Sequence, residues 1–163
     1  MINLSIISSS HMSMRSSPSQ IAYIMKVALE RKNKDYLMEA TGKSGNKVMI
    51  DHSGMEVVQG VSPMELLLMG VGSCSAIDMI SILKKQRQEI TSYKVEVEGE
   101  RYLLDDSRPF KEMHVNVFLE GVIDPDKAQK AADLSFEKYC SVSKTFDKIV
   151  AIHYKVVVNA SQS

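Results

Sequence analysis

The sequence has little cysteine and no excess of charge of either sign. Only two of its 163 residues are cysteines, Cys74 and Cys140, and its 20 basic side chains balance its 20 acidic ones. Two cysteines far apart in the sequence are too few for a secreted disulfide framework. Without a basic surplus, the chain lacks the electrostatic footprint of a nucleic-acid-binding protein. We therefore expect a cytoplasmic protein with no nucleic-acid partner, since cytoplasmic thiols stay reduced unless they are catalytic.

Metal-ligand motifs and targeting signals are also missing. The chain has no CxxC motif and no Cys/His cluster, so we predict neither a metal site nor a bound cofactor. Its first basic residue, Arg15, follows a very short apolar start, which is the reverse of the order in a secretory signal. Residues 1–19 are rich in serine, and we interpret them as a flexible N-terminal arm or extension. A single domain is expected over residues 20–163.

One apolar segment organises the rest of the chain. Ser62 suits a helix N-cap, and Pro63 suits the first helical turn because its missing N–H would have no partner there. Residues 66–77 carry no charge and place apolar side chains on every face of a helix, which must then be buried or span a membrane. Asp78 interrupts this run before it reaches the roughly 18–20 residues that cross a bilayer. The segment at 63–86 therefore predicts a buried helix and no membrane partner.

Alternating apolar and polar residues predict strands on both sides of this helix. The segments with this pattern are residues 21–39, 47–51, 93–98, 113–120 and 149–159. Asp124 and Pro125 open a second helix, which we expect to continue to Cys140. The order β-β-β-α-β-β-α-β predicts the α+β class, with antiparallel sheets wrapped around a long buried central helix.

The apolar surface of the central helix also predicts a homodimer. A six-stranded sheet can cover one side of this helix, but the helix is apolar on more than one side. Leaving the remainder exposed would create a larger apolar patch than soluble monomers usually show. We therefore expect two protomers that wrap around each other's central helices.

The chemistry depends on Cys74 and Cys140, which this folding can bring together beneath the sheet. One interpretation is that both are small core residues, because free cysteine is among the most buried residue types. The other is a redox pair, in which a peroxide oxidises one thiolate to sulfenic acid and the second thiol condenses with it. The redox pair requires a lowered pKa at Cys74. The local sequence supplies no cation, and Asp78 would oppose ionisation if it faced the thiol.

Three segments carry a family resemblance: SPMELLLMGVGSCSAIDMISILKKQRQ, SYKVEVEGER and YCSVSK. They resemble the OsmC/Ohr family, bacterial proteins of osmotic induction and organic hydroperoxide resistance, and the similarity covers about residues 25–159. The resemblance implies an intertwined homodimer with two sheets around central helices and the active cysteines at the subunit interface. It further implies that Cys74 is the peroxidatic thiol and Cys140 the resolving thiol of a peroxidase acting on organic hydroperoxides. The implied reductant is a dithiol, which is a lipoyl group in the Ohr branch.

The sequence departs from the peroxide-reducing branch at its activating residues. That branch pairs its reactive cysteine with an Arg from an N-terminal turn and a Glu directly after the helix-start Pro. Here the turn carries Lys43, and Met64 follows Pro63, with Glu65 one residue later. Lys43, Glu65 and Arg101 are the candidate supporting groups. These features resemble the less characterised OsmC-like branch, and the alternative function is a non-catalytic protein that binds an apolar small molecule between subunits.

Overall fold

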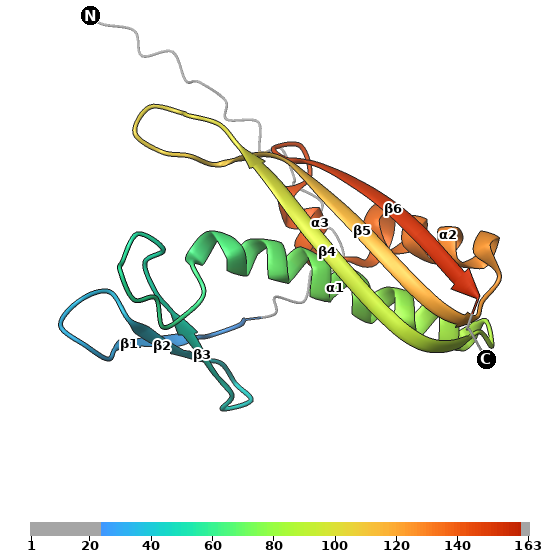
Figure 1. Cartoon of the computed structure of the whole chain (residues 1–163), viewed down its shortest axis with the longest axis horizontal. Coiled ribbons are helices and arrows are strands. Elements are labelled where there is room, and N and C mark those ends of the chain that lie inside the picture. Colours follow the sequence, from blue (N-terminus) through green and yellow to red (C-terminus); the bar gives the residue numbers. More distant parts are fainter. Residues whose placement is uncertain (1–23, 161–163) are drawn as a thin grey trace, which may run out of the picture.

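A long helix packs under a three-stranded sheet, and a second three-stranded sheet stands at the N-terminal end of this helix (Figure 1). The structure, a computed structural model, describes residues 24–160. The predicted arm at residues 1–19 and the start of the first predicted strand at residues 21–23 lie outside this part of the chain.

The element order follows the predicted pattern, with two short helical pieces added before the last strand. In chain order the elements are β1 (Ala28–Arg31), β2 (Met38–Thr41), β3 (Lys47–Ile50), α1 (Pro63–Lys85), β4 (Glu89–Arg101), β5 (Phe110–Val122), α2 (Pro125–Leu134), η1 (Ser135–Tyr139), α3 (Ser141–Phe146) and β6 (Ala151–Ala160). The α+β class and the central helix are confirmed. The two strands after α1 extend several residues beyond the alternating segments that predicted them.

Local sequence fixes both ends of α1. Ser62 and Glu65 form a capping box: the Glu65 N–H donates to Ser62 Oγ at 3.3 Å, and the Ser62 N–H donates to Glu65 Oε2 at 2.7 Å. These bonds satisfy two of the amide groups that a helix start leaves without partners. Lys84 and Lys85 lie in the last turn, where positive charge stabilises the carbonyl end of the helix dipole. The predicted helix boundaries are confirmed.

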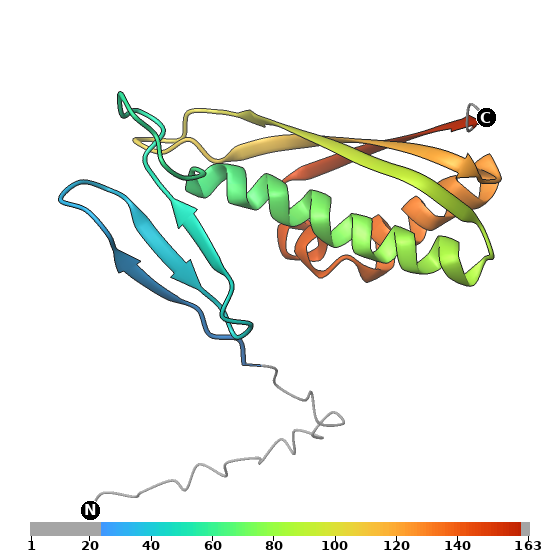
Figure 2. The same ribbon diagram turned by 60° about the horizontal axis from the view of Figure 1, so that its bottom comes forward.

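Helix α1 buries one face and leaves the opposite one open. The buried residues are Val71, Gly72, Ser75, Met79 and Leu83, and they pack against β4 and α2. By length and composition α1 is apolar enough to cross a membrane, although only 28% of its most apolar window is buried in this chain. Figure 2 shows the helix lying along one side of the β4–β6 sheet with α2 and α3 beside it, as a core helix does.

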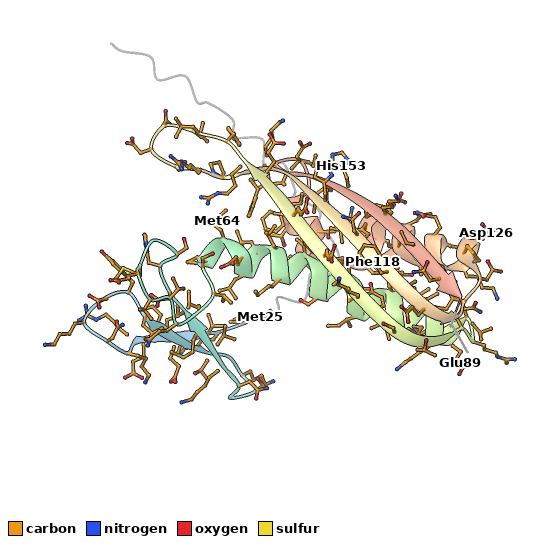
Figure 3. All side chains as sticks on the ribbon, in the orientation of Figure 1. Met25, Met64, Glu89, Phe118, Asp126 and His153 are labelled. Atoms are coloured by element: carbon orange, nitrogen blue, oxygen red, sulfur yellow. The ribbon has the colours of Figure 1, made fainter. Side chains whose placement is uncertain are left out.

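The sheet above α1 is mixed. Strands β4 and β5 pair antiparallel, whereas β6 runs parallel to β5, with His153 opposite His114. The dry face carries Met113, Val115, Val117 and Leu119, all at most 1% exposed, and these residues form the core with α1 and α2. Phe118 and His153, labelled in Figure 3, stand on the outer face.

Two features of the sheets differ from the prediction. The six strands form two three-stranded sheets and not one of six, and the pairing of β5 with β6 is parallel where antiparallel sheets were expected. Alternation tells which face of a strand is buried, but it does not tell which strand lies beside it. The connection through α2, η1 and α3 is long enough to return the chain in the parallel direction.

The sheet of β1, β2 and β3 is a small antiparallel meander with little cover of its own. Leu29 on β1 is 52% exposed and Val48 on β3 is 43% exposed. Ile50 on β3 forms a bridge with Val61, just before α1, and the meander stands away from the β4–β6 sheet (Figure 2). It presents apolar side chains to solvent within a single chain.

The second helix ends earlier than predicted. Helix α2 begins as expected, with the Asp124 carboxylate accepting from the Asp126 and Lys127 amides and Pro125 in the first position. It then widens into the π-helical turn η1, and Cys140 takes an extended conformation that separates η1 from α3. Phe136 is buried while Tyr139 is 49% exposed, so the two do not share one buried face as a continuous helix would require.

Candidate thiol site

Helix α1 and the break before α3 bring the two cysteines together. Cys74 lies midway along α1, and Cys140 lies 66 positions later in the sequence. The ligating atoms of Cys74, Asp78 and Cys140 all lie within 4.8 Å of one another. Both cysteines are free, Cys140 being fully buried and Cys74 partly exposed. The two sulfurs therefore meet at the edge of the core, with one of them open to solvent.

The helical structure is interrupted at Cys140, and this interruption directs backbone amides toward both sulfurs. The Ser143 N–H donates to Cys140 Sγ at 3.4 Å, and the Ser143 hydroxyl donates to the same sulfur at 3.1 Å. The preceding amide, from Val142, donates to Cys74. A continuous helix through Cys140 would have engaged these amides with its own carbonyl groups. The extended conformation of Cys140 frees them to contact sulfur, where they favour a thiolate.

Asp78 is the charged group of this site. It lies four residues after Cys74, so both side chains project from the same face of α1. The Ser135 hydroxyl donates to Asp78 Oδ2 at 3.4 Å and to the Ser75 carbonyl at the same distance. Ser135, at the start of η1, thereby links this π-helical turn to the face of α1 that carries Asp78.

The environment of Cys74 disfavours its thiolate. Burial raises the pKa of the Cys74 thiol above its ordinary value, and the neighbouring Cys140 sulfur and the Asp78 carboxylate raise it further. The Val142 amide acts in the opposite direction. In the part of the chain that is described, no basic side chain contributes to this pKa. No cation among residues 24–160 therefore supplies the lowered pKa that a peroxidatic thiol needs.

The three candidate supporting residues lie elsewhere in the single chain. Glu65 sits nine residues before Cys74, about 13 Å along the helix axis, and hydrogen bonds from the Ser62 hydroxyl and amide lower its pKa. Lys43 lies in the turn between β2 and β3. Arg101 ends β4, where its Nε–H donates to the Arg108 carbonyl at 2.6 Å. None of the three acts on the Cys74 pKa.

An apolar groove runs along the side of α1 that faces β4, across the helix from Cys74. It has a volume of about 500 Å³ and runs between α1 and β4. Its lining residues are Glu65, Leu68, Met69, Gly72, Ser73, Val95 and Val97. Cys74 is not one of them: it lies two residues after Gly72, which places it roughly 160° around the helix, so the thiol projects away from the groove.

Sequence reasoning missed the hydroxyl groups of Ser135 and Ser143. The i, i+4 spacing of Cys74 and Asp78 on a predicted helix was a sufficient signal for that pair. Ser143 lies three residues after Cys140, which is the spacing of an N-cap residue and its amide donor. That signal was hidden because Cys140 was interpreted as the end of the second helix and not as the N-cap of a further one. No local signal pointed to Ser135.

The OsmC-like protein family model matches residues 54–155, which is more than half of the chain. The chain belongs to the OsmC family. Among OsmC-family relatives, it is 37% identical over 119 residues to protein YhfA of Escherichia coli strain K12, covering 72% of this chain and 87% of YhfA. The range matched by the family model includes Cys74, Asp78 and Cys140, whereas Lys43 precedes it.

Solved structures agree with this family assignment. A hypothetical protein from Aquifex aeolicus VF5 superposes with a TM-score of 0.76 at 27% identity, covering 86% of this chain and all of that one. An organic hydroperoxide resistance protein from Elizabethkingia anophelis superposes with a TM-score of 0.68, covering 86% of this chain and all of that one, at 11% identity. The second likeness shows the fold alone. The resemblance to the OsmC/Ohr family, stated from three sequence segments, is confirmed.

Proposed function

We propose that this OsmC-family protein is a two-thiol peroxidase that reduces organic hydroperoxides in defence against oxidative stress. The observation that supports this most is the convergence of Cys74 and Cys140 from distant parts of the chain, with their sulfurs within 4.8 Å. Cys74 is the peroxidatic thiol because this residue is partly exposed whereas Cys140 is fully buried, and Cys140 is the resolving thiol. The organic hydroperoxide resistance protein from Elizabethkingia anophelis, which shares this fold, is consistent with the proposal.

The first step oxidises Cys74. Its sulfur attacks the distal oxygen of the hydroperoxide, the O–O bond breaks, and the alkoxide leaves as an alcohol after taking a proton. Asp78 accepts the thiol proton as the attack proceeds and passes it to the leaving oxygen. General-base transfer of this kind removes the need for a preformed thiolate, and catalytic contacts often tighten only when the substrate is bound. The Val142 amide stabilises the negative charge that develops on sulfur.

The second step closes the disulfide. Cys140 attacks the sulfur of the Cys74 sulfenic acid, an S–S bond forms, and the hydroxyl leaves as water. The two hydrogen bonds from Ser143 support the thiolate of Cys140 during this attack. A dithiol, for which a lipoyl group is the candidate, then exchanges with the disulfide and returns both cysteines to thiols.

Peroxide turnover tests this function directly. Reduced protein is mixed with cumene hydroperoxide and either dithiothreitol or dihydrolipoamide, and the peroxide that remains is measured over time. We expect turnover by the wild type and none by Cys74→Ser. Cys140→Ser should consume about one equivalent of peroxide and accumulate a sulfenic acid that dimedone traps. The absence of wild-type turnover with both reductants would exclude the proposal.

A homodimer is the assembly that this function requires. The open face of α1 carries Met69 and Ile77, which are 50% and 69% exposed, and the β1–β3 meander is also uncovered. We infer that a second copy covers both surfaces and encloses the groove between α1 and β4. Lys43 and Arg101 could reach a thiol site only from such a partner or by movement of their own segments. The expected cellular location remains the cytoplasm, where a dithiol reductant is available.

The groove between α1 and β4 supports a second candidate function. Its apolar walls from α1 and β4 suit an apolar small molecule, and the raised pKa of Cys74 suits a packing residue better than a nucleophile. In that case the protein binds its ligand without catalysis. Native mass spectrometry of the purified protein would then show a retained small molecule, and both thiols would react slowly with iodoacetamide at neutral pH.

A further inference from the structure

Three ligating groups converge at the thiol site. Cys74 and Cys140 each carry a negative charge when ionised, and Asp78 supplies a carboxylate. Within residues 24–160 these are the side chains whose ligating atoms all lie within 4.8 Å of one another. With both thiols ionised, three negative charges would face one another at this short range. A bound cation would remove this repulsion.

The chemistry of the three groups selects the type of cation. Two thiolates and one carboxylate are ligands of Zn²⁺, whereas Mg²⁺ and Ca²⁺ prefer oxygen ligands alone. Zinc bonds of about 2.3 Å to sulfur and about 2.0–2.2 Å to carboxylate oxygen place tetrahedral ligand atoms roughly 3.6–3.8 Å apart. The observed separations require at most a side-chain adjustment of about 1 Å to reach this geometry.

Each ligand also has an outer hydrogen-bond partner, as metal ligands usually do. Ser143 donates twice to Cys140, Val142 donates to Cys74, and Ser135 donates to Asp78. These donors hold the two sulfurs and the carboxylate in place before any ion arrives. These donors lie in η1 and α3, on either side of the interruption at Cys140. The peroxidase proposal uses only Val142 and Ser143.

The site is open on the side of Asp78. A cavity of about 440 Å³ is lined by Asp78, Ser81, Ile82, Lys85, Gln86, Leu134 and Tyr139. This cavity gives a hydrated ion a path to the carboxylate. It also leaves room for a water molecule as the fourth ligand of a site with three protein ligands.

We propose that the reduced protein binds one Zn²⁺ per chain through Cys74 Sγ, Asp78 and Cys140 Sγ, with water in the fourth position. Binding releases the two thiol protons to solvent, and it keeps both sulfurs from forming a disulfide. Zinc binding and the two-thiol cycle are therefore alternative states of the same residues. The inference does not depend on the peroxidase proposal, because metal binding requires only the reduced thiols and the carboxylate.

The test uses the full-length, fully reduced protein after chelator treatment and removal of the chelator. Zn²⁺ alone is titrated by calorimetry and against a chromophoric chelator, with the expected result of one ion per chain. Co²⁺ serves as a spectroscopic probe, because ligation by two thiolates gives thiolate-to-metal charge-transfer bands and intense tetrahedral bands. The same protein oxidised to the disulfide should bind neither ion. This comparison needs no substitution and so does not depend on the folding of a variant.

Variants then identify the ligands. We expect Asp78→Asn and Cys140→Ser to weaken Zn²⁺ binding by more than the about 10–100-fold that loss of an outer partner costs. Ser143→Ala should weaken it by about tenfold, while Asp106→Asn and Ser141→Ala, both at exposed positions, should bind as the wild type does. Circular dichroism confirms that each variant is folded.

Two results would overturn the inference. One is reduced wild-type protein that binds no stoichiometric Zn²⁺, and the other is Asp78→Asn that binds Zn²⁺ and shows the Co²⁺ spectrum of the wild type. Peroxide turnover is measured separately on the metal-free protein. Turnover without zinc binding would refute this inference alone, and zinc binding without turnover would refute the peroxidase alone.

Discussion

At the scale of single residues, Asp78 distinguishes this site from one that a cation activates. Its carboxylate lies beside Cys74 and raises the pKa of that thiol, where an activating cation would lower it. The carboxylate can act either as a proton acceptor or as a ligand. Both roles require the position one helical turn from Cys74 that the sequence spacing already indicates.

Replacing Asp78 should make Cys74 ionise more readily. In Asp78→Asn the negative charge is removed while the shape is retained, so the Cys74 pKa falls toward its ordinary value. The rate of iodoacetamide alkylation of Cys74, measured against pH in metal-free solution, should then show its midpoint at lower pH than in the wild type. Peptide mass spectrometry assigns the alkylated residue.

Asp106→Asn is the matched control, because this exposed carboxylate lies in the loop between β4 and β5. Its midpoint should equal that of the wild type. An Asp78→Asn midpoint that does not move would show that the carboxylate has no electrostatic effect on the thiol.

The site residues differ in how far the sequence could reveal them. Cys74 and Asp78 share a helix, and their i, i+4 spacing fixes their proximity as soon as the helix is predicted. Cys140 approaches them only because the chain returns through β4, β5 and α2, which no local pattern encodes. Its pairing with Cys74 was a hypothesis from the predicted folding and from the family resemblance. Ser135 and Ser143 depend on a helix break that the local sequence did not indicate.

At the scale of elements, the site depends on how closely α1 lies against β4. Small residues permit this approach at two points, Gly72 on the helix and Gly99 on the strand. A Cβ at Gly72 would lie 2.9 Å from Val97 Cγ2, and a Cβ at Gly99 would lie 2.6 Å from Phe110 Cδ1 and 2.9 Å from Leu68 Cδ2. Because neither glycine has a side chain, α1 can pack closely against β4 at these two points.

We expect Gly99→Ala to destabilise the protein by about 1–3 kcal/mol, the usual cost of overpacking a core. The Phe110 ring is only 6% exposed and cannot swing into solvent to make room. Urea unfolding followed by circular dichroism, at one fixed protein concentration, measures the free energy of unfolding. Gly42→Ala is the control, since a Cβ there meets nothing within 4 Å. Equal stability of the two variants would mean that α1 and β4 are not closely packed at this point.

The elements themselves were largely predictable, and their neighbours were not. The caps at Ser62 and Asp124 and the alternation along β4 and β5 are local signals, and the structure contains the elements they predict. The parallel pairing of β6 with β5 depends on the route of the intervening helices, and alternation is the same for either direction of pairing. The helix break at Cys140 is likewise absent from the periodic pattern, because the residues on both sides of it are compatible with a helix.

At the scale of the whole molecule, the apolar surfaces that a single chain leaves exposed predict that two copies associate. Met69, Ser73 and Ile77 form one ridge of α1 at four-residue spacing, and all three are exposed in the single chain. Apolar positions on the β1–β3 meander are exposed as well. A second copy could bury both surfaces at once, since each chain presents the same pair of surfaces. Such a dimer is the state in which the groove between α1 and β4 would be enclosed.

A charge placed on this ridge should therefore separate the subunits. Wild-type protein is expected to sediment as a dimer in analytical ultracentrifugation, and Ile77→Lys as a monomer at micromolar concentration. An unpaired ammonium group buried at an interface costs several kcal/mol, which is enough to shift the equilibrium of a dimer of moderate affinity. Val122→Lys introduces the same charge at a residue that is 73% exposed at the end of β5, away from the ridge, and it should remain a dimer. A monomeric wild type would contradict this assembly. So would an Ile77→Lys variant that sediments as Val122→Lys does. In either case the open face of α1 would not be the surface that a second copy covers.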